Sequence, residues 1–223
     1  PQVHDKICRS VRYSAGGDKI VVAGFDGKTS VWNREERNGK PYFTLGAVCE
    51  GHENEVKSAG LSSCGKYLAS CGRDRCVWVY EEVSDGVYDC INVLQPHDKD
   101  VKHIEWHPNE LMFITCSYDN TSCIFGFDGE DFAVLQILKA HEETVWAAAW
   151  HKNGSLIATC SQDRTVKLWS SSVSYSVANK PSNKWYVSNS FSGMMGRSNA
   201  YSNSNNVVGS EQQWHEVGDI PAN

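Results

Sequence analysis

The sequence contains no run of eighteen apolar residues, and charged side chains occur throughout its first 25 residues. A helix that crosses a bilayer needs about 20 consecutive apolar residues, and a secretory signal needs an apolar block after a basic start. These absences predict a chain that neither spans a membrane nor enters the secretory pathway. The chain starts with Pro1 and not with Met, as expected of a fragment, a processed product or an incomplete gene model.

Cysteine pairs with metal-binding or redox spacing are also absent. The nine cysteines are an odd number, and no two of them are separated by only two residues. A disulfide framework normally uses an even number of cysteines, and a four-cysteine zinc site uses CxxC pairs. We therefore predict a reducing compartment, the cytosol, and expect no metal site and no cofactor.

Clustered basic residues and catalytic motifs are missing as well. Lys and Arg number 21 against 27 Asp and Glu, which gives a net charge of −6. Affinity for a phosphate backbone depends on clustered Lys and Arg, so a nucleic-acid partner is not expected. The sequence has no GxSxG elbow, no glycine-rich phosphate loop and no HExxH motif. We predict a non-enzymatic protein that binds other proteins.

A repeat of 44 to 48 residues organises the chain up to residue 169. Four histidines are each followed, 22 residues later, by an aspartate, and six residues beyond each aspartate stands an aromatic residue. The sets are His4, Asp26 and Trp32; His52, Asp74 and Tyr80; His97, Asp119 and Phe125; and His141, Asp163 and Trp169. Between these anchors, short β-forming segments alternate with Gly, Asp and Arg turn residues, which predicts several strands per repeat.

This pattern resembles the WD repeat, whose units form the four-stranded blades of a β-propeller. The resemblance covers residues 4–169, with repeats near residues 4–32, 52–80, 97–125 and 141–169. It implies an all-β fold in which residues 1–169 form a propeller arc. The arc is expected to be incomplete, because seven blades are usual in the family and four are recognisable here.

The recurring polar residues have a structural explanation. The Asp accepts hydrogen bonds that fix a tight turn, while His, a hydroxyl and an indole satisfy one another inside the blade, at roughly 1 kcal/mol net per bond. The first repeat has Val22 in place of the hydroxyl. The other sets are His52, Ser70, Asp74 and Tyr80; His97, Thr115, Asp119 and Phe125; and His141, Thr159, Asp163 and Trp169. Equal spacing places each pair in its own blade, so the pairs form no common catalytic or metal centre.

The composition changes after Trp169. Residues 170–223 are rich in Ser and Asn and contain few branched apolar residues. Such a segment cannot bury enough apolar surface to offset the entropy of ordering, which predicts a disordered tail. Residues 184–187, Lys-Trp-Tyr-Val, are the segment expected to form a remnant of a further blade.

A binding surface is predicted from the repeat positions that flank the turns. Residues five after each His and immediately before each Asp should lie on one rim of the propeller. Arg and aromatic residues are enriched in the energetic centres of interfaces, and Arg pairs with carboxylates through two parallel bonds. The predicted partner-binding rim consists of Arg9, Lys57, Lys102, Trp146, Phe25, Arg73, Tyr118 and Gln162, with Arg73 first. Alternatively, its cations only keep the rim solvated.

Three blades also carry a more specific resemblance. Residues 51–58 with 73–81, residues 100–108 with 117–119, and residues 141–146 are similar to blades of the WD-repeat subunits of cytosolic iron-sulfur protein assembly. That family is not catalytic. The resemblance implies a scaffold that joins the protein subunits of an iron-sulfur targeting complex and serves apoprotein clients in the cytosol and the nucleus. Some members carry a Leu-Tyr-Arg co-chaperone motif where this chain has Ile124-Phe125-Gly126, so that contact is not expected here.

Two other functions stay open at this stage. One is a WD-repeat adaptor of a ubiquitin ligase, chromatin complex or trafficking coat, which would share the fold and the rim. Many ligase adaptors of this fold have Trp-Asp at a blade end, whereas Trp32 and Trp169 are followed by Asn33 and Ser170. The other is an enzyme with catalytic groups in the propeller channel, for which the sequence offers no motif.

Overall fold

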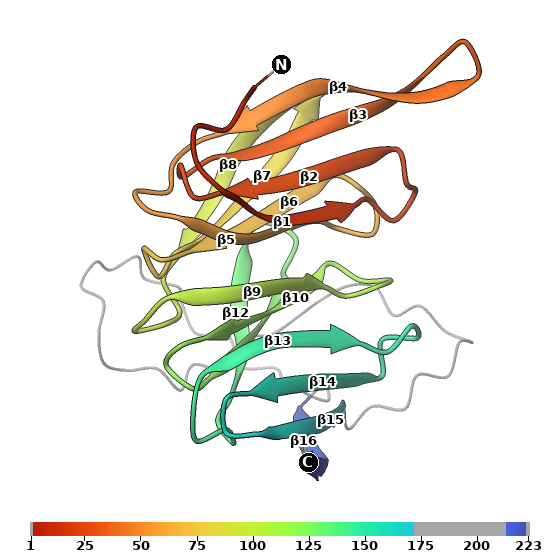
Figure 1. The fold of residues 1–223 in the computed structure, drawn as a ribbon. Coiled ribbons are helices and arrows are strands. Elements are labelled where there is room, and N and C mark those ends of the chain that lie inside the picture. The colour runs from red at the N-terminus through yellow and green to blue at the C-terminus, as the bar shows by residue number, and fades with distance from the viewer. Residues whose placement is uncertain (1, 172–212, 222–223) are drawn as a thin grey trace, which may run out of the picture.

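Four antiparallel β-sheets form a stack that follows the chain. In a computed structural model, which describes residues 2–171 and 213–221, each sheet has four strands in chain order. Figure 1 shows the sheets following one another from the top of the view to the bottom, with the first and the fourth at opposite ends of the stack. Within the described ranges no helix is long and apolar enough to cross a membrane. The prediction of an all-β fold built from propeller blades is confirmed.

The strand bounds follow the repeat closely. The first sheet contains β1 (Cys8–Tyr13), β2 (Lys19–Gly24), β3 (Thr29–Arg37) and β4 (Lys40–Cys49). The second contains β5 (Val56–Leu61), β6 (Tyr67–Gly72), β7 (Val77–Ser84) and β8 (Val87–Leu94). The third contains β9 (Val101–Trp106), β10 (Met112–Ser117), β11 (Ser122–Phe127) and β12 (Phe132–Leu138). The fourth contains β13 (Val145–Trp150), β14 (Leu156–Ser161), β15 (Thr165–Ser171) and β16 (Trp214–Pro221).

The first strands of the sheets lie next to one another. β1 contacts β5, β5 contacts β9, and β9 contacts β13, so these strands form the inner edge of the arc. Each anchoring His lies just before such an inner strand, and each Asp lies in the turn between the second and third strands of its sheet. The repeat therefore places equivalent residues at equivalent places in every blade.

Apolar side chains fill the three spaces between successive sheets. Val21 and Val31 pack with Leu68 between the first two sheets, and the next space holds Tyr67, Ile104 and Phe113. The last space is filled by the cluster of Met112, Ile114, Ile124, Ile157 and Trp169. Successive side chains of a strand point to opposite faces, so a sheet covered on both sides needs apolar or small residues throughout. This explains why every residue of β6 and of β10 is buried.

The end of the chain differs from the predicted tail over residues 170–223. β15 continues through Ser171, and Trp214–Pro221 forms β16, which pairs along the whole of β15. Trp214 is 3% exposed and packs against Trp150, and its backbone N–H and carbonyl both bond to the Gln136 side chain. The buried Trp214 indole and the pairing along β15 offset the entropic cost of ordering this short segment. The average composition of residues 170–223 does not reveal these two features. The predicted blade remnant at 184–187 lies outside the described residues.

Candidate protein-binding rim

Each blade contains one hydrogen-bonded His and Asp network. In the fourth blade, His141 Nδ1 donates to Asp163 at 2.7 Å, and His141 Nε2 lies 2.8 Å from the Thr159 hydroxyl. The Trp169 indole N–H donates to the same hydroxyl at 3.0 Å. The indole, hydroxyl and imidazole thus form a continuous chain of donors and acceptors that ends at the carboxylate, with every member satisfied.

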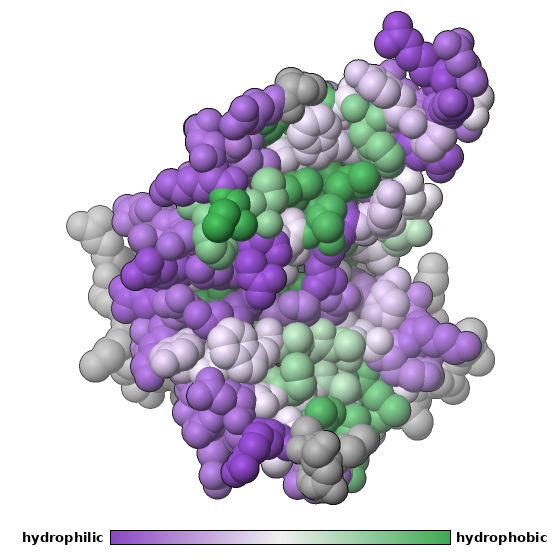
Figure 2. Space-filling model, in the orientation of Figure 1, coloured by the Kyte–Doolittle hydropathy of each residue, from purple (hydrophilic) through white to green (hydrophobic). Residues whose placement is uncertain are grey.

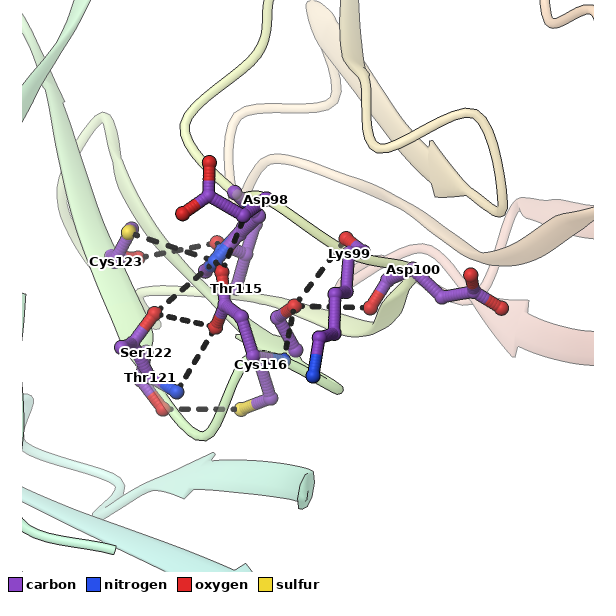
Figure 3. Close-up of polar contacts among 11 residues, drawn as sticks. Asp98, Lys99, Asp100, Thr115, Cys116, Thr121, Ser122 and Cys123 are labelled. Atoms are coloured by element: carbon purple, nitrogen blue, oxygen red, sulfur yellow. Dashed lines mark hydrogen bonds and ion pairs between the residues drawn. The ribbon is translucent and has the colours of Figure 1, made fainter. Parts of the chain in front are cut away.

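The second and third blades keep the His, hydroxyl and Asp contacts. His52 bonds to Ser70 at 2.9 Å and to Asp74 at 2.7 Å. In the third blade, His97 bonds to Thr115 at 2.8 Å and to Asp119 at 2.9 Å. The Trp position is filled differently: the Tyr80 hydroxyl donates to the Glu50 carbonyl, and Phe125 stacks on Phe113 with ring centroids 4.6 Å apart. Figure 3 shows Thr115, Thr121 and Cys123 converging on the third network.

The first blade obtains its hydroxyl from an unexpected strand. His4 Nε2 lies 2.8 Å from Ser30 Oγ, and the Trp32 indole donates to the same atom at 2.9 Å. Ser30 is on β3, directly opposite Val22 on β2, where the other blades place the hydroxyl. The side chains of directly opposed residues share one face of a sheet, so the hydroxyl has moved across a strand pair without leaving the network.

The networks change the acidity of their carboxylates. Burial alone would raise the pKa of Asp74, but the His52 hydrogen bond and charge outweigh it and hold the pKa below its usual value. Burial would also raise the pKa of Asp119, but hydrogen bonds from Thr121 and His97 and the charge of His97 have a larger, opposite effect. The pKa of Asp119 therefore lies far below its usual range. The pKa values of Asp26 and Asp163 are lowered by equivalent contacts. All four carboxylates are therefore ionised near neutral pH and serve as fixed acceptors.

The same four turns bring the predicted rim residues together. In every blade the residue before the Asp donates its backbone N–H to the carbonyl of the residue three after the His. The pairs are Phe25 with Ile7 at 2.8 Å, Arg73 with Glu55 at 2.9 Å, Tyr118 with Asp100 at 3.0 Å, and Gln162 with Thr144 at 2.9 Å. Positions that are far apart in each repeat therefore share one rim of the propeller.

Cations and aromatic rings alternate along this rim. Lys57 Nζ lies 4.1 Å from the centroid of the Phe25 ring, which links the first two blades. Lys102 Nζ lies 5.0 Å from the Tyr118 ring and 5.8 Å from the Trp146 ring, which links the third and fourth. Burial lowers the pKa of Lys57, and the nearby charges of Lys102 and Arg73 add to the effect. These contacts hold the cations in place before any partner binds.

The remaining rim positions are more exposed. The side chain of Arg73 is 58% exposed and pairs with Glu55 at 3.1 Å. Tyr118 and Trp146 are 46% and 45% exposed, and Arg9 and Gln162 are also exposed. Sequence reasoning missed Lys99, whose Nζ lies 5.3 Å from the Tyr118 ring. Lys99 lies two residues after His97, whereas the chosen position, Lys102, lies five residues after it.

A second polar cluster lies along the inner edge and was also missed. Arg12 on β1 forms an ion pair with Glu105 on β9 and contacts the His103 ring at 3.2 Å. It passes Gly60 of β5, where an added Cβ would lie 3.6 Å from the Arg12 side chain. Arg12, Gly60 and Glu105 each lie eight residues after the His of their own repeat, but spacing within a repeat does not show that the side chains of the first and third blades meet.

The His, Cys, Asp and Glu side chains do not gather into a metal site in the described part of the chain. Cys71 and Cys116 are fully buried, and burial raises the pKa of the Cys116 thiol to about 12. A thiol with such a high pKa is protonated at neutral pH and is therefore a poor nucleophile and ligand.

Comparison with known proteins identifies the repeat. The model of the WD domain, G-beta repeat family (WD40) matches residues 2–33, 41–81, 88–125 and 132–170, together more than half of the chain. Each match after the first combines the outer strand of one sheet (β4, β8 or β12) with the first three strands of the next sheet, and β16 lies beyond the last match.

Several fungal proteins are similar over part of the chain, each named "Probable cytosolic iron-sulfur protein assembly protein 1". The Neurospora crassa protein is 34% identical over 118 residues, which cover 40% of this chain and 25% of the relative. The Malassezia globosa protein is 38% identical over 92 residues, covering 38% and 26%. The Candida glabrata protein is 40% identical over 83 residues, covering 35% and 25%.

The chain spans about a quarter of the length of these relatives. The family model, in contrast, matches the chain in four successive repeats, and each blade contains the His and Asp pair at the same place. The chain therefore belongs to the WD40 repeat family.

Proposed function

We propose that this chain is a non-enzymatic scaffold of cytosolic iron-sulfur protein assembly. It would dock the protein subunits of a targeting complex, and its apoprotein clients would receive their clusters outside the mitochondrion. The observation that carries the proposal is the similarity to several relatives with that name, at 34% to 40% identity. The name of these relatives also supports a location in the cytosol.

The rim is the proposed docking surface. It is composed of Arg73, Lys57, Lys102, Tyr118, Trp146, Arg9, Phe25 and Gln162. Two features of its geometry support this role. The rings of Tyr118 and Trp146 are close to half exposed, which leaves apolar area for a partner to cover. Lys57 and Lys102 are only partly exposed and lie against rings, so little side-chain entropy is lost when a partner carboxylate binds them.

Arg73 is the proposed centre of this surface. Of the rim cations that form an ion pair, Arg73 has the most exposed side chain, and its partner among the described residues is Glu55. An exposed ion pair of this kind contributes about 0 to 1 kcal/mol to folding, so its loss should leave the blade intact. Replacing it by an acid would instead repel an acidic partner surface, which costs binding free energy directly.

The test is a pull-down from cytosolic extract with tagged wild-type chain, Arg73→Glu and the matched control Arg37→Glu, read by mass spectrometry. Arg37 is an exposed arginine at the end of β3, in the hairpin that projects away from the stack (Figure 1). We expect wild type and Arg37→Glu to recover iron-sulfur targeting subunits, and Arg73→Glu to recover several-fold less.

The outcomes separate the parts of the proposal. Recovery of subunits of a ubiquitin ligase, a chromatin complex or a coat in place of iron-sulfur proteins would overturn the assembly role. Equal recovery by Arg73→Glu and wild type would leave the assembly role standing but exclude this rim as the docking surface.

A further inference from the structure

Among the described residues, 2–171 and 213–221, no further sheet covers either end of the stack, and the first end is apolar. Val11 and Tyr13 on β1 face away from the second sheet and are each 66% exposed. The equivalent residues of the third blade, Ile104 and Trp106, are 1% and 8% exposed because the second sheet covers them. Figure 2 shows an apolar band over the region where Figure 1 draws β1 and β2.

The opposite end of the stack exposes the face of the fourth sheet that, in the second and third sheets, packs against the sheet that follows. Leu156 on β14 is 37% exposed, whereas the residues at its position in the second and third blades, Tyr67 and Met112, are 6% and 2% exposed. Those two are covered by the sheet that follows them. Ala158 and Leu168, on the same face as Leu156, are half-buried.

The two end faces are of the two kinds that pack against each other between neighbouring sheets. Between successive sheets of the described chain, one sheet contributes the face that carries the repeat position of Leu156. The next sheet contributes the face that carries the repeat position of Tyr13. Hydrogen bonds between sheets also fix how successive sheets are aligned. The Trp106 indole donates to the Gly60 carbonyl at 2.8 Å, and the Trp150 indole donates to the Glu105 carbonyl at 3.2 Å. Tyr13 stands at the position of those two indoles.

We infer that two copies of this chain associate head to tail, the first-sheet face of each covering the fourth-sheet face of the other. Each copy supplies four sheets, so the closed ring would contain eight blades, within the range of about four to eight that propellers adopt. Two equal contacts related by a two-fold axis close such a ring and cover both end faces of each copy. The inference is independent of the rim and its proposed partners.

The test is the mass of the full 223-residue chain by sedimentation velocity over a range of concentrations. We expect twice the chain mass of 24.8 kDa at higher concentration. Tyr13→Asp and Leu156→Asp should each raise the concentration of half-dissociation by at least about tenfold, because each buries a charge without a partner. The matched control is Val93→Asp on β8, which is 52% exposed and distant from both end faces.

The two variants also test the arrangement of the faces. A mixture of Tyr13→Asp and Leu156→Asp retains one unaltered contact and should associate more strongly than either variant alone. A monomer at every concentration would overturn the inference, as would masses that grow beyond the dimer. Dissociation by Tyr13→Asp but not by Leu156→Asp would also overturn it, since that result indicates two first sheets packed face to face. Circular dichroism checks that each variant is folded.

Discussion

The first and third sheets have the same strand order and the same His and Asp network, yet they differ in burial. The third sheet has a neighbour on each side, and Phe113, Phe125 and Ile124 are fully buried. The first sheet has a neighbour on one side only, so Val21 and Val31 are buried while Val11 and Tyr13 are exposed. The repeat therefore specifies the shape of a blade, whereas its neighbours supply most of the burial that stabilises it.

The largest expected effect is at the position seven residues after the His. Ile104→Ala should lower the free energy of unfolding by about 2 to 5 kcal/mol, because it leaves a cavity between the second and third sheets. Val11→Ala, at the same position of the first blade, should change it by less than about 0.5 kcal/mol. Urea unfolding of the dissociated monomer measures both. Equal losses at the two positions would contradict the burial difference.

The next effect concerns the hydroxyl of the first blade. Ser30→Ala removes the partner of both His4 and Trp32 and should cost about 1 to 3 kcal/mol of stability. Val22→Thr in the same chain should restore much of that loss, because Val22 and Ser30 lie opposite each other on β2 and β3. A double-mutant cycle by urea unfolding measures the recovery. Purely additive effects would show that the hydroxyl cannot return to the position used by the other blades.

The contribution of the His and Asp network to the pH dependence of stability should differ between the first and third blades. The pKa values of Asp26 and Asp119 are lowered in the folded chain from the usual 3.8, and that of Asp119 is lowered further. A lowered pKa stabilises the fold above 3.8, and this contribution is lost as pH falls from there toward the folded-state pKa. Asp119→Asn should therefore flatten the loss of stability on acidification more than Asp26→Asn does. Thermal melts between about pH 5 and pH 3 measure it.

The smallest effect is expected in the turns. The residue after each Asp has a positive φ: 85° at Gly27, 69° at Arg75, 71° at Asn120 and 68° at Arg164. Gly27 suits this conformation best and Asn120 tolerates it, whereas Arg75 and Arg164 are strained there, so Arg75→Gly should raise stability by about 1 kcal/mol or less. Gly27→Ala should lower it, because the new Cβ would lie 2.7 Å from the His52 carbonyl oxygen. Thermal unfolding compares the two variants, and destabilisation by Arg75→Gly would contradict the assignment of strain.

The sequence was sufficient for the blades because their signals are local. The spacing of His52 and Asp74 recurs in four copies, and each pair bonds within its own sheet. The rim positions followed from the same spacing, and the structure places them beside the turns. Whether partners bind there is a separate question, which the pull-down addresses.

Features that depend on distant residues could not be predicted in this way. β16 pairs with β15 across residues 172–212, and a polar segment between them hides the strand when composition is averaged. Ser30 was missed because the search for a hydroxyl followed one strand, and the replacement lies on the neighbouring strand. In both cases the missing information is which strands lie side by side.

The Arg12 contact has a consequence for how the stack comes apart. In a linear array whose units touch only adjacent units, the ends fray one unit at a time. Arg12 joins the first sheet directly to Glu105 and His103 of the third, past the second. This next-nearest-neighbour coupling penalises opening of the first blade alone, so hydrogen exchange of β1 amides should report a cooperative unit of three blades.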